Sequence, residues 1–414
     1  MSNIYEKFRS EIAAGGAVEQ SDGSVDRKQS LISGAAIIGL LAWLGLRDAW
    51  ILVFVVGLLI SVFLHEVGHF VTARRTGMKV TQFYMGFGPR LWSTTRGGVE
   101  YGIRALPLGA FVRIVGMNNL DEVDPADEPV TYRAQSYPRK LLVITAGSLM
   151  HLIIGVVLFT TVYSSWGRYQ ELGAVTISAL ADGDSPASRA GIQEGDVIVA
   201  IDDTTVTTRS QFVNAIVANE PGDQVTVTIN RDGTSSSLDV VLAEHPDVPG
   251  SAFFGVASTS AGYADLGVVE SVGRSVADIG TTVTESVKGL VAALNPVNSL
   301  EHLTNENADP ATRPTTVVGI SQVSGSVGES DGLKGILLLL ASLNIFVGVF
   351  NMLPLLPFDG GHAAIATYER LRSRPGKPYR ADISKMIPVA TTVVVLLAFL
   401  LATGLYLDLT RPLG

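Results

Sequence analysis

The stretch SVFLHEVGHFVTARR, Ser61 to Arg75, follows an apolar run that carries no charge from Trp50 to Leu64. A helix needs about 20 mostly apolar residues to cross the hydrocarbon core of a bilayer, so this region predicts a membrane span. His65, Glu66 and His69 lie inside it. Ionisable side chains are expensive to place in a membrane and usually mark a functional site.

His65, Glu66 and His69 form an H-E-x-x-H pattern. Positions i and i+4 share one face of a helix, so the two imidazoles can bind one zinc ion. Glu66 lies beside them and can accept the proton of an attacking water. The alternative interpretation is two hydrogen-bonded histidines on a helix face. A membrane setting weakens that alternative, because polar groups without partners are costly there.

The composition agrees with several spans. Of the 414 residues, 47% are hydrophobic and 17% are charged, and the mean hydropathy is +0.34. The chain has no cysteine, which excludes disulfides, thiolate metal sites and cysteine nucleophiles. The net charge of −9 argues against a nucleic-acid partner.

Five segments are apolar enough to be considered as spans: Leu31 to Leu46, Trp50 to Ala73, Leu141 to Trp166, Gly335 to Leu356 and Met386 to Leu407. The first is short, and it is interpreted either as a hairpin partner of the second or as an interfacial segment. Residues 1–30 are polar and mixed in charge, and they are expected to form a flexible cytosolic tail. Residues 31–166 and 331–414 are the two predicted membrane regions.

Basic residues indicate the orientation. They flank the predicted spans at Arg27, Lys28, Arg74, Arg75, Lys79, Arg139, Lys140, Arg370, Arg372, Arg374, Lys377 and Arg380. A cytoplasmic N-terminus with five spans puts all of them inside and puts Arg168 to Ser330 outside. That segment has 7 Lys and Arg against 21 Asp and Glu, a net charge of −14, which leaves +5 for the rest of the chain.

The outer segment begins with short β-rich runs between turns. Its stretch SPASRAGIQEGDVIVAIDD resembles the bacterial PDZ module, which predicts a PDZ domain over residues 170–262. Such modules bind an extended peptide by strand addition beside a helix. The expected groove lies between Leu172–Val175 and the helix Ser210–Asn219. A steric cap without a peptide ligand is the alternative.

Residues 263–330 are expected to hold an amphipathic helix and a substrate-clamp loop. Apolar residues recur at helical spacing from Leu266 to Leu294, which predicts a helix lying on or near the membrane surface. The segment Thr315 to Gln322 has β character, and it is expected to clamp the substrate on the outer side.

Two histidines leave zinc one ligand short of the three that catalytic sites usually have. FNMLPLLPFDGGH, Phe350 to His362, supplies a candidate in Asp359, just after two prolines that interrupt the helix. Counted from the span ends, Asp359 reaches a depth similar to that of the histidines. A helix-terminal acid without a metal is the alternative reading of Asp359, and His362 is a rival ligand.

The stretch from Gln82 to Gly116 reads as β-strands joined by glycine-rich turns, on the cytosolic side between two spans. A transmembrane helix hides its carbonyl groups in its own hydrogen bonds, and an exposed strand edge offers replacements. We expect this hairpin to pair with the substrate, with Gly86, Phe87 and Gly88 at its inner turn. A surface hairpin without substrate contact is the alternative.

Together, the intramembrane HEVGH, the GFGP segment, the PDZ-like module and NMLPLLPFDGGH resemble the site-2 protease family of intramembrane zinc metalloproteases. The closest branch is the bacterial regulator of sigma-E protease type with one PDZ domain. The resemblance covers about Trp50 to Leu407. It implies that His65, His69 and Asp359 bind Zn²⁺ and that Glu66 is the catalytic acid and base. It also implies substrate binding by Asn351 and Pro354.

One departure concerns the third span. Where many relatives have a Gly-Pro-x-x-Asn pattern, this chain has AGSLMH, with Ser148 and His151. His151 is interpreted as a neutral, hydrogen-bonded packing residue rather than a residue that supports the metal site.

The sequence therefore predicts an α-helical polytopic membrane protein with four to five spans, a cytosolic-side membrane-associated β-hairpin and an extracytoplasmic α/β PDZ domain. We expect it in a bacterial inner membrane, with the active site near the cytosolic side. The expected substrate is a pre-trimmed single-pass membrane protein, for this family often an anti-sigma factor. PDZ peptides and lipids are the other expected partners. The alternatives are a non-catalytic PDZ scaffold and an unrelated zinc protease with a downstream glutamate ligand.

Overall fold

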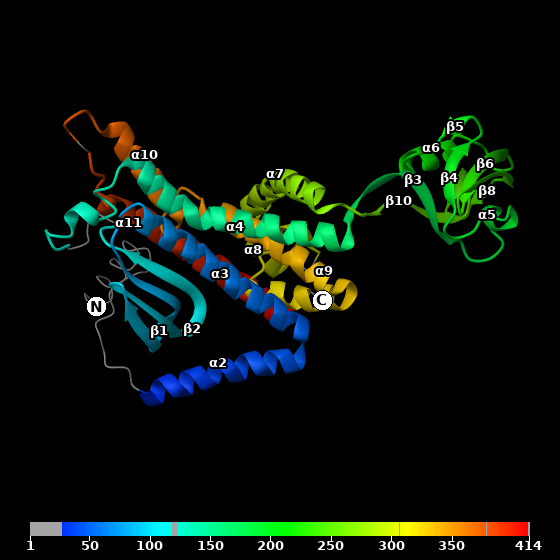
Figure 1. Ribbon diagram of the computed structural model, residues 1–414. Helices are drawn as coiled ribbons and strands as arrows, with labels where there is room; N and C mark the ends of the chain where they lie inside the picture. The colour runs from blue at the N-terminus through cyan, green and yellow to red at the C-terminus, as the bar shows by residue number, and fades with distance from the viewer. Residues whose placement is uncertain (1–26, 118–122, 306, 378, 413–414) are drawn as a thin grey trace. The chain divides into compact units, whose positions relative to one another are not determined.

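The computed structural model describes residues 27–117, 123–305, 307–377 and 379–412 (Figure 1). The predicted tail therefore lies largely outside the described residues. The chain divides into two compact units. The first joins the part before Val162 to the part after Ser271, and the second is Val162–Ser271.

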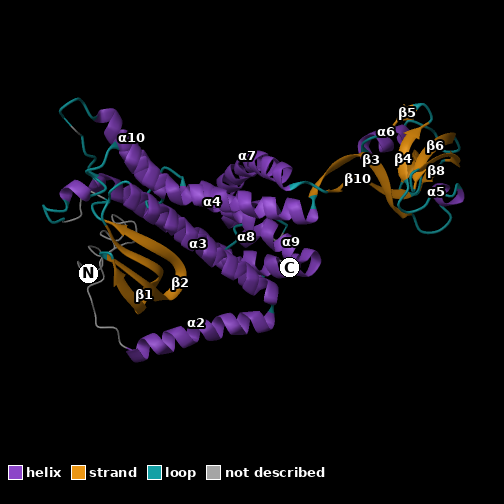
Figure 2. Ribbon diagram, in the orientation of Figure 1, coloured by secondary structure: helices purple, strands orange, loops and turns teal. Residues whose placement is uncertain are grey.

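Among the described residues, four helices are long and apolar enough to cross a membrane: α3 (Ala49–Arg75), α4 (Tyr137–Trp166), α9 (Val317–Asn351) and α11 (Ile387–Thr410) (Figure 2). The helix α2 (Arg27–Arg47) has a shorter apolar part, Ile32–Arg47. Asp48 separates α2 from α3, because its Oδ1 accepts hydrogen bonds from the amides of Trp50 and Ile51 and so caps α3. The predicted membrane fold with four to five spans is confirmed, and the first segment is the short one.

A hairpin follows α3, as predicted, and consists of β1 (Val80–Arg96) and β2 (Val99–Ile114). The predicted inner turn at Gly86, Phe87 and Gly88 is the place where β1 folds back, and a second turn lies further along the chain. The chain reverses at Gly97 and Gly98, both with positive φ, whereas Gly86 and Gly88 lie within β1. They mark a bend, because residues 82–85 face both 110–113 and 100–103 of β2, while residues 92–96 face 99–103. The hairpin is thus folded back on itself. A short 3-10 turn, η1 (Glu128–Val130), precedes α4.

The strand predicted over Thr315 to Gln322 is wrong. These residues begin α9, which is longer than the predicted span and has a non-helical residue at Gly332. β-branched residues suggested a strand, but Thr316 caps the helix by accepting from the amide of Val318. The carboxylate of Asp408, far along the chain on α11, also accepts from the amides of Thr316 and Gly319. This tertiary contact fixes the start of α9.

The predicted amphipathic helix is present as α7 (Val268–Ala293), followed by α8 (Pro296–Thr304) and the 3-10 turn η2 (Pro310–Thr312). The apolar face of α7 points outward, since Val272, Val276, Val287 and Val291 are exposed. Its inner face is polar: Ser275 and Ser286 are buried, and Ser275 accepts a hydrogen bond from Thr160 of α4.

The C-terminal part of the first unit completes the membrane region. After α9 ends at Asn351, a run of turns leads to α10 (Asp359–Arg372). The 3-10 turn η3 (Ile383–Met386) then leads into α11. Pro354 and Pro357 lie in the connection and interrupt helical order there, as the sequence predicts.

The second unit is a β-rich domain with two short helices, α5 (Pro186–Arg189) and α6 (Arg209–Val217). Its main sheet has the order β10-β3-β4-β6-β7, with β5 paired to β4. The bounds of its strands are β3 (Arg168–Leu180), β4 (Val197–Ile201), β5 (Thr204–Thr205), β6 (Gln224–Arg231), β7 (Thr234–Val241), β8 (Ala243–His245), β9 (Val248–Phe253) and β10 (Val256–Ala264). Alternating residues such as Val225, Val227 and Ile229 are buried in its core.

The predicted groove beside Leu172–Val175 needs a correction. That segment belongs to β3, which pairs with β10 on one side and with β4 on the other. β10 is the edge strand, and its Ser260 accepts a hydrogen bond from the first amide of α6, that of Arg209. A peptide added beside α6 would therefore pair with β10. The order of these strands in the sheet depends on pairing between segments far apart in the chain, so the sequence pattern could not predict it.

Candidate metal centre

The helix α3 presents His65, Glu66 and His69 within one turn and a half. Both histidines are buried, and their Nε2 atoms are 3.1 Å apart. Spacing of four residues on a helix produces this approach, as the sequence predicts. Glu66 is half-buried and faces the backbone amide of Val112 on β2. The histidine pair thus has a carboxylate beside it and the hairpin close by.

Asp359 is the first residue of α10. Its Oδ2 lies 3.4 Å from Nε2 of His65 and 3.3 Å from Nε2 of His69. The broken connection after α9 brings it there. A Cβ on Gly360 would collide with the backbone of Met352 and Leu353, so only glycine lets the first turn of α10 lie this close.

The three donor atoms suit a metal ion. His65, His69 and Asp359 form a group that can hold one, within the described residues. Ligands about 2.0–2.1 Å from a tetrahedral zinc are about 3.3 Å from one another. The observed separations of 3.1, 3.3 and 3.4 Å match this value. Asp359 Oδ2 is buried and lacks a hydrogen-bond partner within the described chain, which suits an atom that binds a metal ion.

The helix α4 supports the histidines from behind. Nδ1 of His69 donates to the carbonyl of Val143 at 2.8 Å, because a carbonyl oxygen only accepts. In the neutral ring the lone pair is then on Nε2, which faces the other two donors. A Cβ on Gly147 would collide with both imidazoles, so the backbone of α4 lies directly against them.

His151 of α4 was expected to be a buried, hydrogen-bonded packing residue, and it is buried. Its Nδ1 lies 2.8 Å from Oδ1 of Asn344 on α9, and Asn344 Nδ2 donates to Ser61 Oγ on α3 at 3.0 Å. The ring of His151 is also 4.9 Å from that of His65. Neither Asn344 nor Ser61 was predicted from the sequence as a site residue. A lone asparagine in the apolar stretch LLLLASLNIFVGVF was the signal that pointed to the first of them.

The residues expected to bind substrate lie on two separate elements. Gly86, Phe87 and Gly88 are on β1, and Phe87 is 37% exposed. Asn351 ends α9, and Pro354 lies in the turns that lead to Asp359. Phe350 and Phe358 bracket this connection with their rings 4.5 Å apart.

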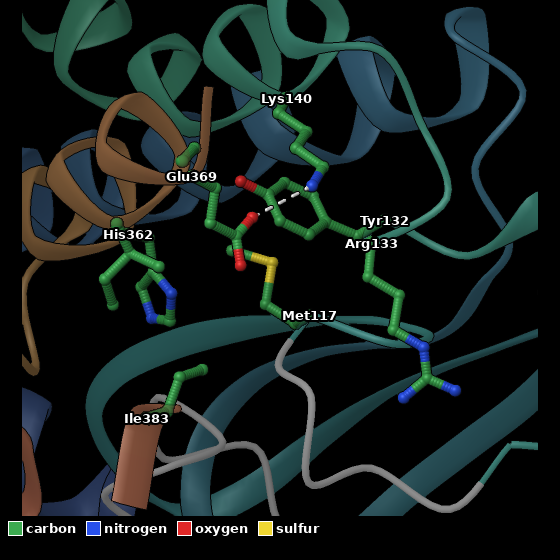
Figure 3. A pocket seen from close by; sticks show the side chains of 9 residues that line it. Met117, Tyr132, Arg133, Lys140, His362, Glu369 and Ile383 are labelled. Carbon is green, nitrogen blue, oxygen red and sulfur yellow. Dashed lines mark hydrogen bonds and ion pairs between the residues drawn. The ribbon is translucent and has the colours of Figure 1, made fainter. Parts of the chain in front are cut away.

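His362, the rival ligand, lies one turn after Asp359 and lines a different site. This is a cavity of about 20 Å³, room for about one water. Figure 3 shows it among Tyr132, Lys140 and Glu369, with Lys140 paired to Glu369 at 3.4 Å. Burial raises the pKa of Tyr132. Met117, Arg133, Ile365, Ala366 and Ile383 complete the lining.

Fold and site together define a membrane-embedded metallopeptidase. Residues 53–395 match the model of peptidase family M50, so the chain belongs to that family and is a metalloendopeptidase of the site-2 protease type. This membership favours an enzyme over the scaffold alternative. The four candidate spans agree with a multi-pass membrane protein.

The chain is similar over nearly its whole length to curated members. It is 34% identical over 397 residues to the zinc metalloprotease Rip1 of Mycobacterium tuberculosis (strain ATCC 25618 / H37Rv), covering 88% of this chain and 98% of that protein. Rip1 of Mycolicibacterium smegmatis is 33% identical over 402 residues, with the same coverage. A putative zinc metalloprotease of Mesorhizobium japonicum is 30% identical over 342 residues, covering 77% and 88%.

Among solved structures, the PDZ domain of an SdrC-like protein from Listeria monocytogenes aligns with 21% identity and a TM-score of 0.19. The alignment covers 21% of this chain and 87% of that one. The solution structure of GtR34C from Geobacillus thermodenitrificans aligns with 27% identity and a TM-score of 0.19, covering 21% and 100%.

Proposed function

We propose that this chain is an intramembrane zinc protease that cuts a peptide bond within the transmembrane segment of another membrane protein. His65, His69 and Asp359 hold the zinc, and Glu66 is the acid and base. The observation that carries the proposal is the triangle of donor atoms at tetrahedral spacing, next to a carboxylate, in a chain of family M50.

The chemistry follows from this arrangement. Zinc, when bound, makes water a better nucleophile at neutral pH and polarises the scissile carbonyl group. Glu66 takes the proton of the attacking water and passes it to the leaving amine. His65 and His69 each present Nε2 to the metal, and the carbonyl of Val143 keeps the ring of His69 in the required tautomer. Gly147 keeps α4 close enough to hold both rings.

The substrate must expose its backbone before cleavage, because a helix protects its own carbonyl groups. We assign this task to the hairpin of β1 and β2, with the bend at Gly86, Phe87 and Gly88 closest to the substrate. Strand pairing replaces the hydrogen bonds that unwinding breaks. Glu66 faces Val112 of β2, which places the acid and base beside the hairpin. Asn351 and Pro354 hold the substrate from the other side.

The charge distribution supports a direction in the membrane. From the Lys and Arg clusters next to the spans we infer that the metal centre lies near the cytosolic side of a bacterial inner membrane. The acidic segment Arg168 to Ser330 then lies outside. The exposed apolar face of α7, with Val272 and Val276, meets lipid.

The second unit acts as a PDZ module that reads or filters substrates before cleavage. The free edge of β10, beside α6, is where a peptide would add. Filtering suits a substrate that another protease has already trimmed outside, and an anti-sigma factor is the partner that the family resemblance implies.

The test is Glu66→Gln. An amide cannot accept the water proton, so we expect zinc content to remain and cleavage to fall about 10²–10⁴-fold. Cleavage of a reconstituted single-span substrate is the measurement, and Glu285→Gln, at an exposed position of α7 away from the metal centre, is the matched control. Unchanged cleavage by Glu66→Gln would contradict the mechanism. Trimmed membrane stubs that accumulate only in cells carrying this variant identify the substrates.

A further inference from the structure

A line of buried polar groups leads from α9 toward the metal centre. Asn344 is 1% exposed, and its Nδ2 donates to the carbonyl of Leu340 at 2.8 Å and to Ser61 Oγ at 3.0 Å. Because a backbone carbonyl only accepts, these contacts fix which end of the amide is nitrogen. The Oδ1 atom is therefore the one presented to His151.

This orientation decides the tautomer of His151. Its Nδ1 lies 2.8 Å from Asn344 Oδ1, and an amide oxygen has no proton to give. Nδ1 must carry the hydrogen of the contact. In the neutral ring, Nε2 then has a lone pair and is an acceptor. His151 is 2% exposed, so water has little access to the ring.

His65, in contrast, requires a hydrogen-bond acceptor for its Nδ1–H group. Its Nε2 faces His69 and Asp359, and binding a metal through Nε2 leaves the hydrogen on Nδ1. Ligand histidines nearly always donate that second N–H to an acceptor. Nδ1 of His69 has one, in Val143, whereas Nδ1 of His65 is buried without a hydrogen-bond partner in the described chain.

The two rings lie at the distance that such a bond requires. Their centroids are 4.9 Å apart. Two imidazoles joined by an N–H···N hydrogen bond of about 3 Å have centroids about 5 Å apart.

We propose that His151 is the positioning residue of the metal ligand His65: its Nε2 accepts the Nδ1–H of His65, and Asn344 and Ser61 hold it ready to do so. The inference rests on the proposed zinc site. It gives a role in the metal site to a histidine whose sequence context predicts only a packing residue. The backbone carbonyl of Gly147 is the competing acceptor near His65.

The test measures the zinc affinity of the purified full chain by competition with a chelator. His151→Phe keeps the ring and removes the acceptor, and we expect affinity about 10–100-fold weaker, the usual loss for such a partner. His151→Gln returns an acceptor oxygen and is expected to recover most of the affinity. His302→Phe is the control, since His302 is also buried and hydrogen-bonded, to Thr312 on η2.

A second readout separates positioning from packing. Cobalt-loaded His151→Phe should show an altered visible absorption spectrum, and His302→Phe the wild-type one. Wild-type zinc affinity in His151→Phe would overturn the inference and leave Gly147 as the acceptor. Equal losses in the Phe and Gln variants would overturn it as well. A wild-type chain that binds no zinc would refute the proposed function itself, together with this inference.

Discussion

Two aspartates in the membrane unit show opposite environments. Asp408 on α11 is fully buried, and its carboxylate accepts from the amide and hydroxyl of Thr316, from the amide of Gly319 and from Arg313. Asp359 faces two imidazole Nε2 atoms, and its Oδ2 lacks a hydrogen-bond partner within the described chain. A satisfied carboxylate stabilises the fold, while one kept without donors is available for a ligand.

The largest expected effect is that of Asp359→Asn. Removing one of the three proposed metal ligands should weaken zinc binding by more than about 10²-fold, beyond the usual loss for a supporting partner. Cleavage should fall to background. The metal-free protein should be no less stable than wild type, since the change removes a buried charge without donors. Zinc content, substrate cleavage and the unfolding midpoint are the measurements. Full zinc and activity would instead favour a downstream glutamate as the third ligand.

The same substitution at the other aspartate should do the reverse. Asp408→Asn breaks a buried pair with Arg313 and weakens the cap of α9, which should lower the free energy of unfolding by about 3 kcal/mol. Zinc stoichiometry should not change. The denaturation midpoint of the detergent-solubilised chain is the measurement. Loss of zinc with unchanged stability would contradict the assignment of Asp408 to fold stability and of Asp359 to metal binding.

The second unit contains a third buried carboxylate, that of Asp196, whose hydrogen bonds are also satisfied. It allows the stabilising role of a satisfied carboxylate to be tested away from the membrane unit. Asp196 pairs with Arg231 at 2.6 Å and accepts from the amide of Gln193. The bonds from Arg231 hold the pKa of Asp196 below its usual value. A lowered pKa stabilises the fold above the unfolded value of about 3.9 and loses that contribution as pH falls through the folded value.

We therefore expect the second unit to lose protection from hydrogen exchange below about pH 4. Asp196→Asn should remove most of that pH dependence and give a small loss of protection at pH 7. Exchange in β4 and β6 is the measurement, with Asp239→Asn on β7 as the control. If Asp196→Asn loses protection from hydrogen exchange at low pH just as the wild type does, then groups other than Asp196 cause the pH dependence.

Local sequence patterns predicted much of the candidate metal centre. The four-residue spacing of His65 and His69 requires only a helix, and a helix follows from the apolar run around them. The prolines before Asp359 interrupt the helix wherever the chain packs. The approach of Asp359 to the histidines was inferred from depth, and the structure brings the three together at 3.1 to 3.4 Å.

The errors share one cause. The start of α9 was taken for a strand because β-branched residues favour one, but Asp408 on α11 stabilises the helix there. The groove was assigned to β3 because strand order depends on pairing between distant segments, which placed β10 at the edge.

The sequence by itself determined the apolar spans, the family, the helix with two histidines on one face and the acid that follows the broken helix. These depend on spacing and composition over a few turns of chain. Only the tertiary structure decided which carboxylate is satisfied and which is free, and which nitrogen of His151 carries its hydrogen. A polar group buried in a membrane takes its role from its partners, and here those partners come from helices far apart in the sequence.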